Sequence, residues 1–397
     1  MIRVPKALAS FAVVALVAAA CSSAAATPSA APTAAPTTAP TAAATAAAAT
    51  PTPAASASAA ASTLKIGVVT DVGRVDDKNF NQYSYQGAKD AADSLGAPVS
   101  YLVPKDATEY AKDIQQFVDQ KTNVIVTVGF NLGNDTIKAA KANPDIWFIA
   151  VDVAPCVDAT GAPDSTFTCK GDASTLLPKL IGIQFQEDQA GYLAGMVAAA
   201  VSKTGVIGQL GGINSNPAVV RYMQGYQLGA KAYKSSVTVD SSFFSTGDIT
   251  KAYGDPVFGK TFSQQFITQK KVDVLFQVAG ATGNGALDAA CAAGIYAIGV
   301  DVDEYQSYPS ADKCIVTSAE KHLSSAVNQT IKLIAGGTAK GGISKFDAKN
   351  DGIGISAFDM TKFNLPSDFQ GKLDAALAGM KDGSLKTCPD TCGTWSN

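Results

Sequence analysis

Residues 124–151 read VIVTVGFNLGNDTIKAAKANPDIWFIAV, and this stretch decides the fold class. Val124–Val128 and Trp147–Val151 are short, β-branched and apolar nearly throughout, which indicates strands that are buried on both faces. Between them, Asn134–Ala142 has the spacing of an amphipathic helix. A strand, a helix and a second strand in this order predict a parallel pair joined by a helical crossover.

The same alternation continues on both sides of this stretch. The further strand candidates are Leu64–Thr70, Pro98–Val103, Leu180–Phe185, Val206–Leu210, Val239–Phe244, Val272–Val278 and Ile295–Val300. The further helix candidates are Phe80–Ser94, Glu109–Gln120 and Asp188–Val201, and a helical pattern also covers 315–335. One compact sheet does not accommodate so many strands, so we expect two doubly wound α/β lobes. The first sheet should end near Phe185 and the second should start near Val206.

The N-terminus reads as an export signal. Arg3 and Lys6 precede an uncharged apolar run, Ala7–Ala20, which is too short to span a bilayer and is typical of a secretory signal. The run ends in three alanines before Cys21, which resembles the lipobox of bacterial lipoproteins, where the cysteine is acylated. Ala18 stands where that motif prefers Leu. We expect a signal peptide over 1–20 and a lipid anchor on Cys21; the alternative is cleavage without lipidation.

A spacer is predicted between this anchor and the folded part. Residues 22–63 contain only Ala, Ser, Thr and Pro, and they carry no charge. Such a segment cannot bury enough apolar surface to offset its ordering entropy. We therefore expect residues 21–63 to be a disordered linker that holds the folded part away from a membrane.

Composition excludes several classes of function. The chain has 34 acidic residues against 31 basic residues, so no excess of positive charge predicts nucleic-acid binding. It has one histidine, no Gly-x-Ser-x-Gly motif and no paired Cys-x-x-Cys motifs, so we expect no cofactor, no metal and no enzymatic activity. An exported hydrolase that uses Asp76 and Asp77 as an acid/base couple remains an alternative.

Six cysteines follow the spacer, and an even number outside the cytoplasm predicts disulfides. They are Cys156, Cys169, Cys291, Cys314, Cys388 and Cys392. Fifteen pairings are possible in principle, and nearest-neighbour pairing is the simplest of them.

Polar residues follow the first strand, where residues 69–82 read VTDVGRVDDKNFNQ. In open α/β sheets, ligands bind beyond the carboxyl ends of strands. This run resembles the signature of the basic membrane protein family of lipoproteins, V-T-D-x-G-x-x-x-D-K-S-F-N-Q, with Asn79 in place of Ser. Similarity continues in order through FQEDQAGYLAG at 185–195, QVAGATG at 277–283 and AIGVD at 297–301. Members of that family are nucleoside-binding components of ABC importers.

The resemblance implies roles for individual residues. Asp71 and Asn79 match positions that hydrogen-bond the purine edge, and Phe80 matches a ring that stacks on the base. Asp301 and Lys321 match groups that hold the ribose.

Three further positions are less closely fixed. The ring opposite Phe80 would come from residues 251–256, which makes Tyr253 the candidate, with Phe244 as a second choice. Asn134 stands where the family often has Asp. Gly280 opens a Gly-rich turn after a strand, and we expect its backbone to approach the ligand rather than to bind phosphate.

These observations together predict a type I periplasmic-binding-protein fold with a ligand cleft and hinge crossovers. We expect lobe 1 to contain 64–185 plus about 314–345, and lobe 2 to contain 186–313 plus about 346–397. The expected function is that of a monomeric, lipid-anchored, extracytoplasmic receptor that delivers a purine nucleoside to ABC permease subunits at the cell membrane. Another small polar solute, such as a sugar, is the alternative ligand.

Overall fold

The computed structural model describes residues 63–395. The predicted signal peptide, Cys21 and the linker except for Thr63 lie outside the described residues. Within 63–395, no helix combines the length and the apolar character that crossing a bilayer requires.

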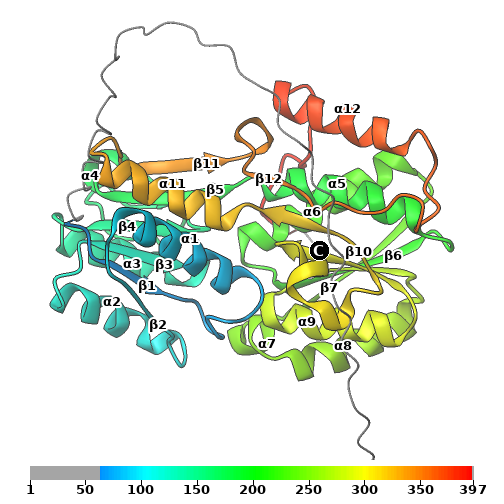
Figure 1. Ribbon diagram of the computed structural model, residues 1–397, viewed down its shortest axis with the longest axis horizontal. Coiled ribbons are helices and arrows are strands. Elements are labelled where there is room, and N and C mark those ends of the chain that lie inside the picture. Colours follow the sequence, from blue (N-terminus) through cyan, green and yellow to red (C-terminus); the bar gives the residue numbers. More distant parts are fainter. Residues whose placement is uncertain (1–62, 396–397) are drawn as a thin grey trace, which may run out of the picture. The chain divides into compact units, whose positions relative to one another are not determined.

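The first sheet forms the centre of lobe 1 (Figure 1). Its order is β11-β5-β4-β3-β1-β2, and every neighbouring pair is parallel. Its strands are β1 (Ile66–Val69), β2 (Val99–Leu102), β3 (Val124–Val128), β4 (Trp147–Val151), β5 (Leu180–Phe185) and β11 (Gly342–Phe346). The helices of this lobe are α1 (Phe80–Leu95), α2 (Tyr110–Asp119), α3 (Gly133–Ala142), the short α4 (Ala173–Leu176) and α11 (Leu323–Ala335).

Strand β3 explains why the lobe 1 strands are apolar throughout. Val124 and Val126 belong to the hydrophobic cluster that includes α1 and α11, whereas Ile125 belongs to the cluster that includes α2 and α3. Both faces of the sheet are therefore covered by helices, as expected for a doubly wound parallel sheet.

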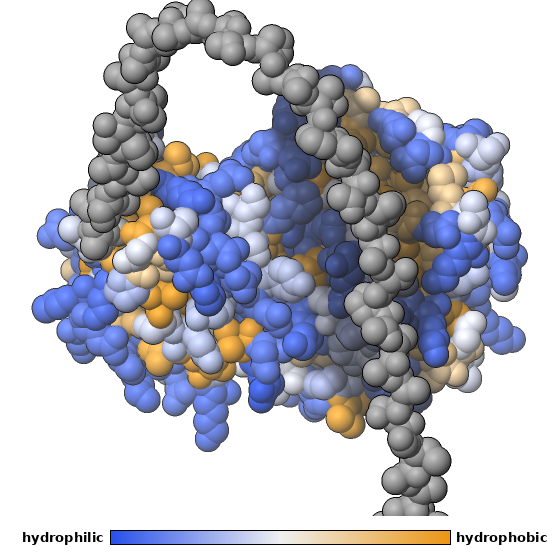
Figure 2. Space-filling model, viewed as in Figure 1, coloured by the Kyte–Doolittle hydropathy of each residue, from blue (hydrophilic) through white to orange (hydrophobic). Residues whose placement is uncertain are grey.

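The second sheet forms the centre of lobe 2 and repeats the layout of the first. Its order is β12-β10-β9-β8-β6-β7, and only the β10–β12 pair is antiparallel. Its strands are β6 (Val206–Ile213), β7 (Thr238–Ser245), β8 (Val274–Val278), β9 (Tyr296–Asp301), β10 (Ile315–Lys321) and β12 (Ile353–Ile355). Its helices are α5 (Glu187–Val201), α6 (Pro217–Tyr233), α7 (Ile249–Tyr253), α8 (Pro256–Lys270), α9 (Gly280–Ala292), α10 (Glu304–Ser307) and α12 (Phe369–Asp382). The face in Figure 2 shows hydrophilic residues over much of its area, with apolar areas between them.

The chain passes between the lobes three times: after β5, between β10 and α11, and between β11 and β12. The prediction that lobe 1 resumes near residue 314 is wrong, because β10 pairs with β9 in the second sheet. The helical prediction over 315–335 is also wrong for Ile315–Lys321, where β-branched residues favour a strand. Lobe 1 resumes only at α11, whose Ser324 hydroxyl donates to the carbonyl of Tyr83 on α1.

All six cysteines of the described part form disulfides, which pair Cys156 with Cys169, Cys291 with Cys314, and Cys388 with Cys392. This is the nearest-neighbour pairing.

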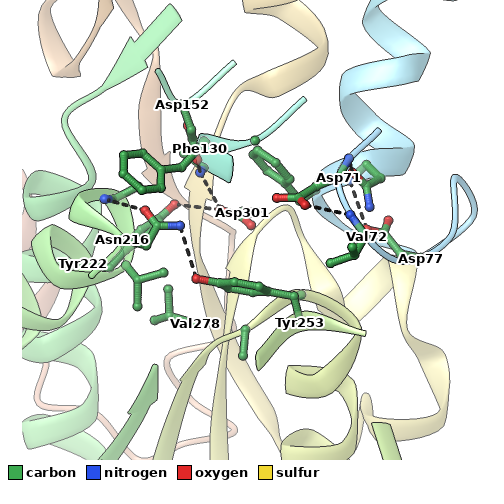
Figure 3. A pocket seen from close by; sticks show the side chains of 18 residues that line it. Asp71, Val72, Asp77, Phe130, Asp152, Asn216, Tyr222, Tyr253, Val278 and Asp301 are labelled. Atoms are coloured by element: carbon green, nitrogen blue, oxygen red, sulfur yellow. Dashed lines mark hydrogen bonds and ion pairs between the residues drawn. The ribbon is translucent and has the colours of Figure 1, made fainter. Parts of the chain in front are cut away.

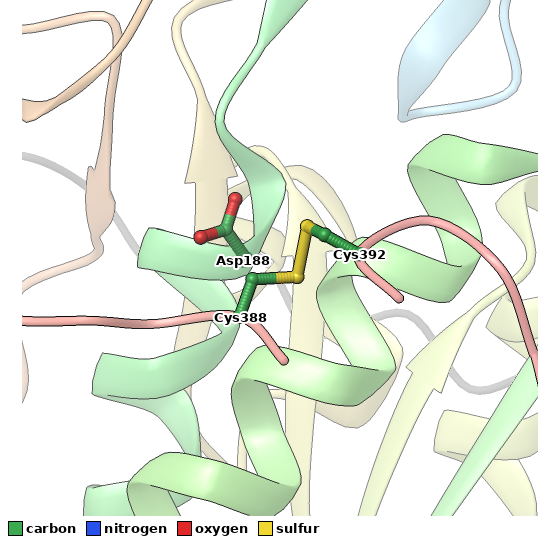
Figure 4. A group of neighbouring side chains, drawn as sticks. All are labelled: Asp188, Cys388 and Cys392. Atoms are coloured by element: carbon green, nitrogen blue, oxygen red, sulfur yellow. A yellow bond between two sulfur atoms is a disulfide. The ribbon is translucent and has the colours of Figure 1, made fainter. Parts of the chain in front are cut away.

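The Cys388–Cys392 disulfide lies beside Asp188 at the start of α5 (Figure 4). Because both sulfur atoms are bonded to each other, this group offers no thiolate to a metal ion. Gln224 on α6 donates to the carbonyls of Thr391 and Thr394, so the C-terminal segment is held on lobe 2.

Candidate ligand-binding site

A cavity lies at the carboxyl ends of strands from both sheets (Figure 3). Lobe 1 lines it with Asp71, Val72, Asp77, Phe80, Asn81, Gly129, Phe130 and Asp152. Lobe 2 lines it with Asn216, Ala218, Val219, Tyr222, Tyr253, Val278, Ala279, Gly280, Asp301 and Lys321. Both lobes thus contribute aromatic rings and carboxylates to one cavity.

Lys321 is the cation of this cavity. It ends β10, is 4% exposed, and its Nζ lies 2.6 Å from Asp152 Oδ2 and 3.2 Å from Asp301 Oδ1. Asp152 follows β4 in lobe 1, whereas Asp301 ends β9 in lobe 2. The ammonium group therefore joins carboxylates from two different sheets.

The pKa values of this triad reflect burial and mutual attraction. Burial lowers the pKa of Lys321, but the carboxylates of Asp152 and Asp301 outweigh it and hold the pKa above its ordinary value. Burial raises the pKa of Asp152 to about 6 and also raises the pKa of Asp301, in both cases against the attraction of Lys321. Two acids share one cation in a place with little water, so additional hydrogen-bond donors would find acceptors here.

Both acids occupy an unusual backbone conformation. The φ of Asp152 is 60° and the φ of Asp301 is 66°, in the left-handed region that side chains other than Gly rarely adopt. Strained residues of this kind persist where the surrounding structure fixes them, and they concentrate at functional sites.

Asp71 supplies a second polar group, distant in sequence from the triad. Its carboxylate accepts from the backbone N–H of Val72 at 2.7 Å, from Asn131 Nδ2 at 3.0 Å and from the hydroxyl of Tyr110. Burial raises its pKa, and these three donors oppose the rise. Asn81 accepts from the backbone N–H of Asp71 through its Oδ1. The carboxylate is therefore held in one orientation at the cavity wall.

A glycine makes room for this carboxylate. Gly129 follows β3 with a φ of 109°, and a Cβ at that position would overlap the Asp71 side chain. Only glycine meets both the backbone and the space requirement.

The aromatic lining comes from both lobes. The Phe80 ring centroid lies 4.7 Å from Lys321 Nζ. The Tyr253 hydroxyl accepts from Asn216 Nδ2 at 3.2 Å, and Figure 3 shows this ring across the cavity floor below Asp301. Gly212 on β6 leaves the space for Tyr253, since an added Cβ would overlap the ring. Tyr222 donates to Asp301 Oδ1 at 3.3 Å and so braces the triad.

The structure brings together six of the eight residues that the sequence suggested for ligand binding. They are Asp71, Phe80, Tyr253, Gly280, Asp301 and Lys321. Asn134 does not join them, because it lies exposed on α3, one helical turn beyond the loop that reaches the cavity. Phe244, the second choice for the opposing ring, packs against Phe262 in the lobe 2 core.

Asn79 is also absent from the cavity lining. Its side chain is fully buried and donates to Val300 O and Glu304 Oε1 of lobe 2. Asn81, two residues later, lines the cavity instead. At the start of α1, Asn79 therefore points to Glu304, while Phe80 and Asn81 point to the cavity.

The two acids of the alternative acid/base couple are engaged separately. Asp76 is exposed and pairs with Arg74 at 2.6 Å. Asp77 is buried, which raises its pKa to about 6, and its carboxylate accepts from backbone N–H groups at the start of α1.

Five residues of the cavity were not predicted from the sequence to bind the ligand: Asp152, Tyr222, Asn216, Phe130 and Asn81. A signal existed for Asp152, which is the polar residue directly after the strand Trp147–Val151. Asn216 precedes Pro217 and caps α6, a pattern typical of helix starts that predicts the turn but not the direction of the side chain.

The chain is similar to known proteins over most of its described length. A family model described as ABC transporter substrate-binding protein PnrA-like, named Bmp, matches residues 64–377. An ABC transporter nucleoside-binding protein of Lactococcus lactis is 27% identical over 341 residues, which cover 81% of this chain and 88% of that protein. Basic membrane protein D of Borreliella burgdorferi is 29% identical over 305 residues, which cover 75% of this chain and 80% of that protein.

A solved solute-binding protein of an ABC transporter system from Aeropyrum pernix has a TM-score of 0.68 at 21% identity, covering 81% of this chain and 92% of that chain. This confirms the two-lobed α/β fold. The chain belongs to the Bmp family of ABC transporter substrate-binding proteins, which bind a small solute outside the cytoplasm and serve a membrane permease.

Proposed function

We propose that this protein binds a nucleoside, most favourably a purine nucleoside, between its lobes and delivers it to an ABC permease. The proposal rests on one observation, which is that two parts of the cavity are lined by different kinds of side chain. One part holds the buried triad of Asp152, Lys321 and Asp301, and another holds the fixed carboxylate of Asp71, while the rings of Phe80 and Tyr253 line the same cavity. A nucleoside has the matching division into a sugar and a flat base.

The triad suits the sugar. The carboxylates of Asp152 and Asp301 accept from vicinal hydroxyls, while Lys321 donates to a hydroxyl or ring oxygen. Asp152 Oδ1 is buried and has no hydrogen-bond partner within the described chain, so an acceptor is available. A ligand that lacks the hydroxyls would leave buried charges without added partners, and its affinity would fall.

The Asp71 region suits the base. Aromatic rings such as Phe80 and Tyr253 stack on bases with about 1–3 kcal/mol each. A carboxylate accepts from ring and exocyclic N–H groups, and Asn81 adds an amide at the same wall. Guanosine and inosine carry an N–H in the six-membered ring, and this group can donate to a carboxylate. Adenosine has no N–H at that ring position and offers only its exocyclic amine. A carboxylate can therefore distinguish the first two nucleosides from the third.

Delivery follows from the arrangement of the lobes. Ligand contacts on both lobes favour the closed arrangement over an open one, because only closure brings Asp152 to Lys321 and Asp301. The closed surface is what the permease would recognise. A lipid on Cys21 and the charge-free spacer over 22–63 would keep the receptor near that permease at the outer face of the cell membrane.

Titration calorimetry tests the proposal. Purified protein is titrated with guanosine, inosine, adenosine, a pyrimidine nucleoside, guanine and ribose. We expect heat from the purine nucleosides, with both ribose and guanine binding at least about a hundredfold more weakly because each fills half of the cavity. Binding of ribose or another free sugar without any nucleoside would replace the proposal by that of a sugar receptor.

The matched variants are Phe80→Ala and Tyr101→Ala. Phe80 lines the cavity, whereas Tyr101 is an exposed aromatic residue of the same lobe whose ring contacts Tyr85, outside the cavity lining. The first change should abolish detectable nucleoside heat and the second should leave it unchanged. Equal heats for both variants would contradict stacking on Phe80.

A further inference from the structure

Asn79 crosses from one lobe to the other. It stands at the start of α1 in lobe 1, yet its Nδ2 donates to Glu304 Oε1 at 2.8 Å and to the carbonyl of Val300 at 3.2 Å, both in lobe 2. The Asn79 side chain is fully buried. A buried amide of this kind is costly unless its hydrogen bonds are made, so its contacts depend on the lobes being together.

The loop in front of α1 leaves the Asn79 side chain free of the capping role. A residue at the start of a helix ordinarily caps it, but the Asn79 side chain makes no capping bond. Asp77 does this instead, since its carboxylate accepts from the N–H groups of Asn79, Asn81 and Gln82 at 2.9–3.1 Å. Lys78 between them has a φ of 66°. The strained backbone and the substitute cap together direct Asn79 at lobe 2.

The receiving carboxylate is fixed by lobe 2 alone. Glu304 is fully buried at the start of α10, and its Oε2 accepts from Gln277 Nε2 at 2.7 Å and from the N–H of Val300 at 2.9 Å. Its own N–H donates to Ser318 Oγ. These bonds leave Oε1 for Asn79 and need no contribution from lobe 1.

A second contact runs in the opposite direction. Asn284 on α9 of lobe 2 donates from Nδ2 to the carbonyl of Asp77 at 3.1 Å. The loop 77–79 therefore gives and receives hydrogen bonds across the same boundary. It continues into Phe80, and Val300 continues into Asp301, so the contact lies directly behind the cavity wall.

We propose that Asn79 and Glu304 form a latch that holds the lobes closed without a ligand. In this assignment Asn79 is a positioning residue that sets how much of the protein is closed, and it does not touch the ligand. The inference depends on the proposed function only for the choice of a nucleoside as the binding probe.

The substitution Asn79→Asp reverses the hydrogen-bonding sense of the latch. It keeps the size of the side chain but sets a carboxylate against the Val300 carbonyl and, at a pH above the Glu304 pKa of about 8, against the ionised Glu304 in the closed arrangement. The measurements below are therefore made above that pH. In the open arrangement the new carboxylate reaches water, and aspartate is a good residue at a helix start. The change therefore penalises closure and leaves each lobe able to fold.

The first measurement uses no ligand. Spin labels on the exposed residues Gln116 of α2 and Gln265 of α8 report the distance between the lobes. We expect Asn79→Asp to shift the distance distribution to longer values. Adding Glu304→Gln should shift it back, because the amide of the introduced glutamine can then donate to the aspartate while its carbonyl still accepts from Gln277. Asn328→Asp, the same change on α11, is the control.

A distance distribution that is unchanged by Asn79→Asp would overturn the latch. So would a second substitution at Glu304 that opens the lobes further instead of closing them.

The second measurement separates a latch from a base contact. Calorimetry with guanosine and with adenosine should show Asn79→Asp weakening both by the same factor, about ten- to a hundredfold. A change in the ratio of the two affinities would show that Asn79 touches the base and would overturn the proposal. If the unaltered protein binds neither nucleoside, the proposed function fails, and the ligand-free distances still decide the latch.

Discussion

The two lobes share a scaffold but contribute different chemistry to the cavity. Their strand orders correspond position by position, and β4 and β9 each lead into an aspartate with positive φ, Asp152 and Asp301. The equivalent strands β5 and β10 differ: β5 ends in the buried Phe185, whereas β10 ends in Lys321. Acids thus come from both lobes and the cation from one, so the triad is complete only when the lobes meet.

The lobes also solve one packing problem in two ways. In lobe 1, Gly129 makes room for the Asp71 carboxylate and adopts a conformation with positive φ. In lobe 2, Gly212 makes room for the Tyr253 ring within an ordinary strand. One glycine is needed for space and conformation, and the other for space alone.

Removing the shared cation should have the largest effect. Lys321→Met leaves two buried carboxylates facing each other without a cation, and breaking a buried pair in this way costs about 3–5 kcal/mol. We expect nucleoside affinity, measured by calorimetry, to fall roughly a thousandfold or more. Lys372→Met, which breaks an exposed pair with Asp368, should change affinity little. Unaltered binding by Lys321→Met would mean that the triad does not hold the ligand.

Removing one disulfide from each lobe compares how much the two bonds stabilise the protein. Cys156–Cys169 lies in lobe 1 and Cys291–Cys314 in lobe 2, with sequence separations of 13 and 23. Loop entropy predicts that replacing either pair by serines lowers the free energy of unfolding by about 3 kcal/mol. Urea titration of the two double variants should therefore give similar losses. A loss of stability in only one of the two variants would show that the two disulfides are not equivalent.

Substitutions at Gly129 and Gly212 should distinguish a need for space from a need for positive φ. Gly129→Ala should weaken nucleoside binding and also lower the free energy of unfolding by about 1–3 kcal/mol, because alanine disfavours its positive φ. Gly212→Ala should weaken binding about tenfold through displacement of Tyr253, with a smaller loss of stability. Gly371→Ala, with open space at its Cβ, is the control. Equal stability losses for the two cavity variants would refute the distinction.

The smallest expected effect is a change in the slope of stability against pH. Burial raises the pKa of Asp77 and Asp152 to about 6 and that of Glu304 to about 8. An acid with a higher pKa in the folded state binds its proton more tightly there. Its stabilising effect is full below the unfolded pKa of about 4 and is lost as the pH rises through the folded pKa.

The free energy of unfolding should therefore fall from about pH 4 to 6 through the lobe 1 acids and further from about 6 to 8 through Glu304. Urea titrations of Glu304→Gln between pH 6 and 8 should show a slope smaller by up to roughly 1 kcal/mol per pH unit. Asp145→Asn, at an exposed acid, should keep the original slope. An unchanged slope in Glu304→Gln would show that Glu304 does not titrate there.

Much of this fold follows from local sequence pattern. The strands Val124–Val128, Trp147–Val151 and Leu180–Phe185 match their predicted bounds, because each is a short run that is apolar nearly throughout. Strands β11 and β12 were missed. The first alternates with Lys and Ser at a sheet edge and the second has three residues, so neither has a distinctive pattern.

The site was predictable where the polar residue ends a strand. Asp301 does so in lobe 2, and the same rule would have identified Asp152 in lobe 1. Lys321 ends β10, which was predicted to be helical, so only the family resemblance pointed to it. Asn79 could not be assigned in this way. Its direction depends on the φ of Lys78 and on a carboxylate 225 positions later in the chain, in the other lobe.

A crystal structure of the protein with bound guanosine tests the central claim most directly. We expect the ribose hydroxyls to contact Asp152, Lys321 and Asp301, with the base beside Asp71 and between rings from the two lobes. A guanosine bound elsewhere, or one with its ribose at Asp71 and its base at Lys321, would contradict it.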